Sequence, residues 1–343
     1  MRRREFINKC GQLGIGLVGL AALTGCSRNK PAGVISRQVP TTTGEQVQPE
    51  ARPLSDTDLK IGNNRWLAGP EDVDIAVAKD MAPEELVRAA LDRYGGISSW
   101  VHSGDVVVIK PNLAWARQPA QAATTSPEVL AAVIRICQQA NPKRIVVVEH
   151  SCDTASVAFD ISGAKQVCQE LSVPLISLSH ENMYQQVSLP AGRNIHTDQV
   201  ATDILECDVY INLPIVKSHS GAVATIALKN QMGAVWDRGA YHQAGAGSAR
   251  GLNLHQNIAG LAASLRPTLN IVDATRILVT GGPQGPGKVE ERNTVLVSAD
   301  MVAIDAYAVQ LLGYKPQDVP YIGLAAEAGV GKSDLSAIKV AIA

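Results

Sequence analysis

The chain has 343 residues, a formal net charge of −1 and 46% hydrophobic side chains, but only 4% aromatic ones. A chain of this length can bury one large core or two smaller ones. The slightly acidic balance argues against nucleic-acid binding, which needs a concentrated basic surface. Plentiful Ala, Val, Ile and Leu with few aromatics are typical of helices that pack on a buried sheet.

The N-terminus has the three parts of an export signal. A basic start precedes an apolar stretch over residues 13–23, which is too short to cross a bilayer because a spanning helix needs about 20 residues. Residues 3–9 (RREFINK) resemble the twin-arginine export motif, and residues 23–26 (LTGC) resemble the lipobox. We therefore expect residues 1–26 to be a twin-arginine signal peptide with Cys26 lipidated. An ordinary Sec signal with a chance cysteine is the alternative.

These signals predict a location and two partners. The mature protein would be a membrane-anchored lipoprotein on the periplasmic or extracytoplasmic side, held by lipid on Cys26. The export machinery would be a transient partner. Because the twin-arginine route carries folded proteins, a cofactor inserted before export becomes plausible. Removal of residues 1–25 would take away four basic residues and one acidic residue, which moves the net charge from −1 to −4.

The remainder divides into two parts. Residues 27–70 are rich in Pro, Thr, Gln and Arg without an apolar period, which predicts a flexible tether. Residues 71–343 alternate short β-rich runs with helical stretches, which predicts an α/β fold with a mainly parallel sheet and helices on both faces. The pattern fits one large domain or two tightly joined ones.

Several predicted strands are nearly continuous Val and Ile, as expected for strands that are covered on both faces. The expected strands are residues 74–78, 105–109, 144–148, 175–178, 209–213, 269–272 and 294–298. Expected helices cover residues 83–94, 300–312 and 320–328, and another begins at Ser126-Pro127, where an N-cap residue precedes a proline at the first helical position.

Six segments resemble the family called domain of unknown function 362. They are residues 105–113, 124–129, 212–219, 227–233, 270–273 and 299–306. The resemblance spans about residues 74–329 and implies little about activity. Many members of that family carry a ferredoxin-like module with two iron–sulfur clusters, but this chain has no Cys-x-x-Cys-x-x-Cys run.

Polar side chains follow four of the predicted strands. They are Lys110 and Asn112, Glu149 and His150, Lys217 and His219, and Asp273. If these strands are parallel, their carboxyl ends meet at one edge, where open parallel sheets bind ligands. We therefore expect an active or binding site at this edge.

Each side chain has an expected role there. His219 would be the acid–base group, while Lys217 and Lys110 would hold an anion and take part in catalysis. Asn112, Lys229 and Asn230 would bind the ligand, the last two on the strength of the family resemblance. Glu149, His150 and Asp273 would hold a divalent metal ion or position the histidine. Each lysine could instead be an ordinary solvated side chain.

Three functions remain open on these residues. The first is an enzyme that acts on a small anionic substrate, with or without a metal ion. The second is a redox or metal-handling protein, for which an iron–sulfur cluster is less favoured than a divalent metal ion because the cysteines are irregularly spaced. The third is a ligand-binding lipoprotein without catalysis.

Overall fold

The computed structural model describes residues 55–243 and 252–343. The predicted signal peptide with Cys26, and residues 27–54 of the predicted tether, lie outside the described residues. The described residues belong to one compact unit, Pro53–Ala343. Among them, no helix is both long and apolar enough to cross a membrane.

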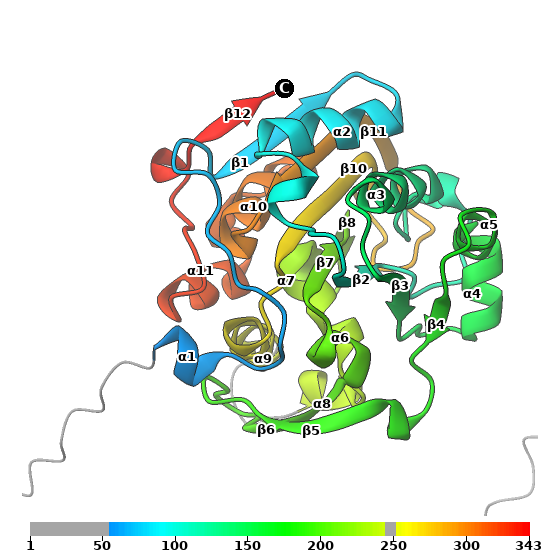
Figure 1. The fold of residues 1–343 in the computed structure, drawn as a ribbon. Coiled ribbons are helices and arrows are strands. Elements are labelled where there is room, and N and C mark those ends of the chain that lie inside the picture. Colours follow the sequence, from blue (N-terminus) through cyan, green and yellow to red (C-terminus); the bar gives the residue numbers. More distant parts are fainter. Residues whose placement is uncertain (1–54, 244–251) are drawn as a thin grey trace, which may run out of the picture. The chain divides into compact units, whose positions relative to one another are not determined.

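A mixed sheet of ten strands runs through the centre of the fold (Figure 1). Its main path, in spatial order, is β12 (Val340–Ile342), β1 (Ile75–Lys79), β11 (Val289–Ser298), β10 (Leu269–Leu278), β7 (Val209–Leu213), β2 (Val106–Pro111), β3 (Arg144–Glu149) and β4 (Leu175–Ser177). On this path only β11 runs antiparallel to its neighbours. The predicted mainly parallel α/β fold is confirmed.

Two short strands extend the sheet beside the site. Strand β8 (Ile215–His219) pairs with the far half of β10, and β9 (Val223–Thr225) pairs antiparallel with β8. Both were missed from the sequence, because Pro214 directly after β7 is typical of a loop. A separate hairpin is formed by β5 (Tyr184–Ser188) and β6 (Thr197–Ala201).

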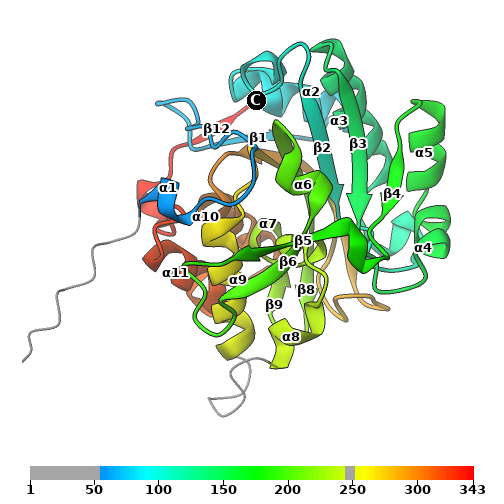
Figure 2. The ribbon, with the colours of Figure 1, turned by 60° about the horizontal axis from the view of Figure 1, so that its bottom comes forward.

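Helices cover both faces of the sheet, as expected (Figure 1; Figure 2). Val107 and Ile109 of β2 pack in one core with α2, α3, α4 and α5, whereas Val108 packs in a second core with α6, α7, α9, α10 and α11. This division follows from the alternation of side chains along a strand. It places Lys110, two residues after Val108, on the α7 side of the sheet.

The four helices that the sequence predicts are present and begin within one residue of the expected positions, although the one predicted over residues 300–312 changes to 3₁₀ geometry after Ala308. The helices are α1 (Asp56–Leu59), α2 (Pro83–Arg93), α3 (Pro127–Gln139), α4 (Ala155–Ile161), α5 (Ala164–Glu170), α6 (Thr202–Glu206), α7 (Ala227–Asn230), α8 (Arg238–Gln243), α9 (Leu252–Ser264), α10 (Met301–Ala308) and α11 (Pro320–Glu327). Ser126 caps α3 by accepting the Val129 N–H, and Asp300 caps α10 by accepting the N–H groups of Val302 and Ala303.

Residues 55–70 differ from the expected tether, because they lie against the domain. The Asn63 N–H donates to the Leu205 carbonyl, and Arg65 forms an ion pair with Asp105. The Arg266 guanidinium lies 4.5 Å above the Trp66 ring. This segment is held by hydrogen bonds, ion pairs and cations over Trp66, and its apolar contacts, Leu59, Ile61 and Leu67, are scattered. Hydrophobic periodicity could therefore not reveal it.

Candidate functional site

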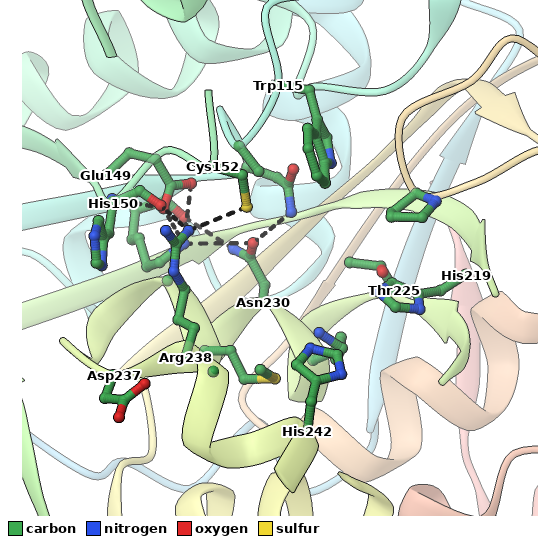
Figure 3. Close-up of a pocket in the computed structure, with 18 of the residues that line it drawn as sticks. Trp115, Glu149, His150, Cys152, His219, Thr225, Asn230, Asp237, Arg238 and His242 are labelled. Atoms are coloured by element: carbon green, nitrogen blue, oxygen red, sulfur yellow. Dashed lines mark hydrogen bonds and ion pairs between the residues drawn. The ribbon is translucent and has the colours of Figure 1, made fainter. Parts of the chain in front are cut away.

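A cavity of about 890 Å³ opens where β2, β3 and β8 end (Figure 3). Eight of the nine residues predicted to form the site line it. They are Lys110, Asn112, Glu149, His150, Lys217, His219, Lys229 and Asn230. In the close-up, Arg238 and Cys152 lie on one side of the cavity, and His219, Thr225 and His242 lie on the other.

Asp273 is the predicted site residue that lies elsewhere. Its carboxylate accepts hydrogen bonds from the Ser126 N–H (2.7 Å) and from the Thr275 hydroxyl (2.6 Å), so it anchors the start of α3. Glu149, His150 and Asp273 therefore do not come together as one set of ligands. Within the described ranges, no group of three His, Cys, Asp or Glu side chains is placed to hold a metal ion.

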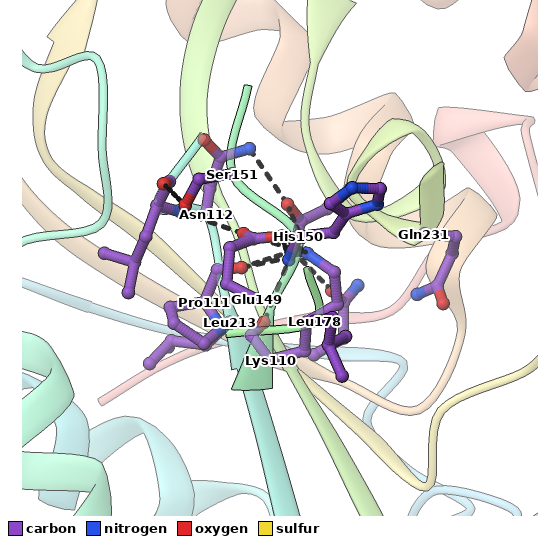
Figure 4. Close-up of polar contacts among 12 residues, drawn as sticks. Lys110, Pro111, Asn112, Glu149, His150, Ser151, Leu178, Leu213 and Gln231 are labelled. Carbon is purple, nitrogen blue, oxygen red and sulfur yellow. Dashed lines mark hydrogen bonds and ion pairs between the residues drawn. The ribbon is translucent and has the colours of Figure 1, made fainter. Parts of the chain in front are cut away.

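A buried ion pair joins the ends of β2 and β3 (Figure 4). Lys110 Nζ lies 3.1 Å from Glu149 Oε1, and both side chains are almost wholly buried. The Glu149 carboxylate also accepts the N–H groups of Leu113 and His150, and Lys110 donates to the Pro111 carbonyl. Burial lowers the pKa of Lys110, and the Glu149 charge opposes this shift. Lys110 is thus held by a counter-ion and is not free to bind an anion.

Four buried asparagines form a continuous hydrogen-bonded chain behind the pair. Asn112 Nδ2 donates to Asn230 Oδ1 (2.9 Å), and Asn230 Nδ2 donates to Asn212 Oδ1 (2.8 Å). Asn212 Nδ2 donates to Asn270 Oδ1 (2.9 Å), and Asn270 Nδ2 donates to the Ser298 carbonyl (3.0 Å). All four amides donate in the same direction, which fixes the Asn112 oxygen as an acceptor toward the cavity.

Lys217 meets the open end of that chain. Its Nζ donates to Asn112 Oδ1 (2.9 Å) and to the Ala123 carbonyl (2.6 Å), and no carboxylate within the described residues pairs with it. Burial, together with the charge of Lys229, lowers the pKa of Lys217 from 10.5 to about 7. A neutral amine would use both of its N–H groups on these two acceptors, which leaves the nitrogen lone pair unshared.

Helix α7 carries Lys229 and Asn230 into the cavity. The Asp305 carboxylate accepts the N–H groups of Ala227 (2.8 Å) and Leu228 (3.1 Å), so a buried acid fixes the N-terminus of this one-turn helix. These contacts give Asp305 a capping role.

His219 is held as a neutral hydrogen-bond donor. Its Nδ1 accepts the N–H groups of Gly221 (3.0 Å) and Ala222 (3.1 Å), so the ring proton resides on Nε2. Burial, with the charges of Lys229 and Lys217, lowers the pKa of His219 to about 3. A histidine with both of these properties donates a hydrogen bond and is a poor base, which changes the role that we predicted for it.

Two residues that line the cavity, Trp236 and Arg238, were not predicted from the sequence. The Arg238 guanidinium donates to the carbonyls of His150 and Ser151 and to Cys152 Sγ (3.2 Å), and it has no carboxylate partner in the described part of the chain. The His150 ring, which donates through Nδ1 to the Val235 carbonyl, stacks on Trp236 with 5.6 Å between centroids. One feature of the sequence could have pointed to Trp236 and Arg238: they come a few residues after segment 227–233, which resembles the family.

The fold and the site define an α/β protein with a cationic cavity at the carboxyl edge of a mainly parallel sheet. The family described as Domain of unknown function (DUF362) matches residues 107–310, and the chain belongs to this family, as the sequence motifs predicted. A relative of the same family is a thylakoid-associated protein of Synechocystis sp. It is 26% identical over 248 residues, which cover 68% of this chain and 71% of the relative.

A solved structure with a similar fold is the lactate racemase apoprotein from Thermoanaerobacterium thermosaccharolyticum. The two chains are 14% identical, with a TM-score of 0.42. The similarity covers 71% of this chain and 59% of that one.

Gly233 is required by the close approach of its backbone to the buried ion pair. A Cβ at this position would lie 2.4 Å from both Glu149 Oε1 and Lys110 Nζ. Displacement of these side-chain ends would break their ion pair and hydrogen bonds, which are buried. We expect Gly233→Ala to lower the free energy of unfolding by about 1–3 kcal/mol, measured by urea denaturation.

The matched control is Gly323→Ala in α11, where a Cβ would meet no atom within 4 Å. That change should leave stability unchanged or raise it by about 0.5–1 kcal/mol, because alanine favours a helix interior. Equal stability of the two variants would show that the ion pair tolerates displacement.

Proposed function

We propose that this protein is an enzyme that binds a small anionic substrate in the cavity and moves a proton to or from it. One observation carries the proposal: Lys217, Lys229 and Arg238 line the same cavity, and none has a carboxylate partner among the described residues. The acidic side chains in the lining are Glu149, which is paired with Lys110, and Asp237, which is exposed.

The chemistry of these cations favours a carboxylate or phosphate as the bound group. A guanidinium presents parallel N–H donors that match two oxygens of either anion, and an ammonium acts as a point charge. Arg238 is already oriented by two backbone carbonyls, so little side-chain entropy would be lost when an anion binds.

Lys217 is the best-placed group for proton transfer. A pKa of about 7 lets the amine both accept and return a proton near neutral pH. The Nε2–H of His219 would stabilise negative charge that develops on a substrate oxygen, as a neutral donor in a partly buried site. Lys110 and Glu149 would not contact the substrate. Their ion pair would hold the ends of β2 and β3 in place around the cavity.

Proton transfer can be measured without knowledge of the product. We expect the protein to exchange the α-hydrogen of at least one small 2-hydroxy or 2-oxo acid with D₂O, followed by NMR. Lys217→Met should lower the exchange rate about 10²-fold or more, the usual contribution of a positioned acid–base group. The control is Lys165→Met, which removes a lysine that is half exposed in α5.

Binding of these acids without any exchange would instead support a ligand-binding protein without catalysis. Equal exchange in the wild type and Lys217→Met would remove Lys217 from the mechanism.

The lowered lysine pKa values also predict how stability depends on pH. Lys217 has a pKa of about 7 in the folded protein and an ordinary value of 10.5. Between these values the unfolded chain binds the extra proton, so the free energy of unfolding should rise with pH. Below pH 7 both states are protonated, and the folded state bears the full cost of burying the charge. One such lysine contributes at most about 1.4 kcal/mol per pH unit.

The measurement is urea denaturation at pH 7, 8 and 9. Lys217→Met should flatten this rise, and saturating phosphate should flatten it as well, because a bound anion stabilises the ammonium form. A slope that is the same in the wild type and the variant would contradict the low pKa of Lys217.

We also propose that the protein is exported by the twin-arginine route and anchored through lipid on Cys26. The support is the order and spacing of the motifs at residues 3–9 and 23–26.

Cys26→Ser should abolish incorporation of labelled palmitate, while Cys10→Ser in the same signal peptide should not. Replacement of both Arg3 and Arg4 by lysine should keep the protein in the cytoplasm, as measured by cell fractionation. Unchanged export of that double variant would indicate the Sec route.

A further inference from the structure

Lys229 is a cation of the cavity that has no polar partner among the described residues. Its residue is 8% exposed, and within the described residues its Nζ makes neither a hydrogen bond nor an ion pair. By contrast, Lys110 and Lys217 each donate to at least two oxygens. The stem of Lys229 is buried while its Nζ is open to the cavity, so the amine is placed to meet an anion or a substrate there.

The surroundings of Lys229 increase the fraction of neutral, nucleophilic amine near neutral pH above that of an ordinary lysine. Burial lowers its pKa to about 8, and the charges of Arg238 and Lys110 lower it as well. A lysine that is desolvated beside other cationic groups is a recognised form of activated nucleophile. Because no acceptor holds the Nζ, its lone pair is free to approach a substrate in the cavity.

The backbone that carries Lys229 is fixed on both sides. Asp305 holds the two preceding N–H groups, and the following side chain, Asn230, is bonded to both Asn112 and Asn212. Only the side chain of Lys229 itself is left without polar contacts. This combination holds the nucleophile close to its working position without blocking it.

We propose that Lys229 forms an imine with a small oxo acid, meaning an aldehyde or ketone that also carries a carboxylate. This inference rests on the proposed function, and it names the substrate class and the covalent step. Arg238 would bind the carboxylate, and the Nε2–H of His219 would donate to the carbonyl oxygen. The cavity of about 890 Å³ is ample for a molecule of this size.

The step balances without any co-reactant. The Nζ lone pair attacks the carbonyl carbon, the C=O π bond breaks, and the oxygen takes up a proton that the nitrogen gives up. The resulting hydroxyl then leaves as water with a second proton from the nitrogen, and a C=N bond forms. Lys217 is the group that can relay these protons, since its pKa is about 7. Nothing is oxidised or reduced.

Lys217 is the competing nucleophile in the same cavity, and the structure disfavours it. Its Nζ is fixed by Asn112 and Ala123, and the residue is 1% exposed. An imine on Lys217 would cost both hydrogen bonds, because the nitrogen gives up its two protons as the C=N bond forms, whereas an imine on Lys229 costs none. The covalent adduct should therefore form on Lys229.

Reductive trapping tests the proposal directly. Full-length protein purified in detergent is incubated with glyoxylate or pyruvate and sodium cyanoborohydride, and its intact mass is measured. We expect one adduct per chain, heavier by the mass of the oxo acid less one oxygen atom, and peptide mapping should place it on Lys229. Lys229→Arg keeps the charge but should lose the adduct, while Lys165→Arg, at a half-exposed site, should keep it.

Two further measurements separate the possible failures. Glycolate, which has a carboxylate but no carbonyl group, should protect Lys229 from trapping and raise the melting temperature of both the wild type and Lys229→Arg. A rise in melting temperature without an adduct, or with the adduct on Lys217 or on exposed lysines, would overturn the imine and leave the anion site in place. If there were neither a rise nor an adduct, both the imine and the proposed function would be wrong. The melting curve of Lys229→Arg also shows whether that variant is folded.

Discussion

The buried ion pair between Lys110 and Glu149 sets the geometry on which the site depends. It ties the end of β2 to the end of β3, and the backbone at Gly233 packs against both charged groups. Removal of either partner from such a pair typically destabilises a protein by about 3–5 kcal/mol, because the other charge is left buried alone. The pair also neutralises one of the three buried lysines in the cavity, so the positive charge that remains belongs to Lys217, Lys229 and Arg238.

The residues around these cations are held mainly by hydrogen bonds to backbone carbonyls and side-chain amides, which are neutral. Carbonyl groups orient Arg238 and Lys217, the Asn230 amide holds Asn112, and the Asp305 carboxylate accepts the N–H groups at the start of α7. Neutral groups can position a cation without cancelling its charge, whereas a carboxylate would cancel it. The site is therefore rigid and still able to attract an anion.

Much of the fold and the site could be predicted from the sequence. Runs of Val and Ile, the Ser126-Pro127 cap and the polar residues after strands have purely local causes, and six site residues followed from them. Lys229 and Asn230 followed from the family resemblance. Asp273 was misplaced because β10 continues to Leu278, so this residue lies within the strand and not at its end. Arg238 was missed because its role depends on the carbonyls of His150 and Ser151, far away in the sequence. The tautomer of His219 depends on a turn that propensities do not specify.

The four-asparagine chain has a consequence for how this family can vary. Every amide in it is a donor to the next and an acceptor from the one before, so an aspartate at any position would set two oxygens against each other. A leucine would leave a buried donor and a buried acceptor unmatched at the same time. Single changes are thus disfavoured at Asn112, Asn212, Asn230 and Asn270 together. Divergence at these positions should occur as a linked set or not at all, so the four would be inherited as one unit.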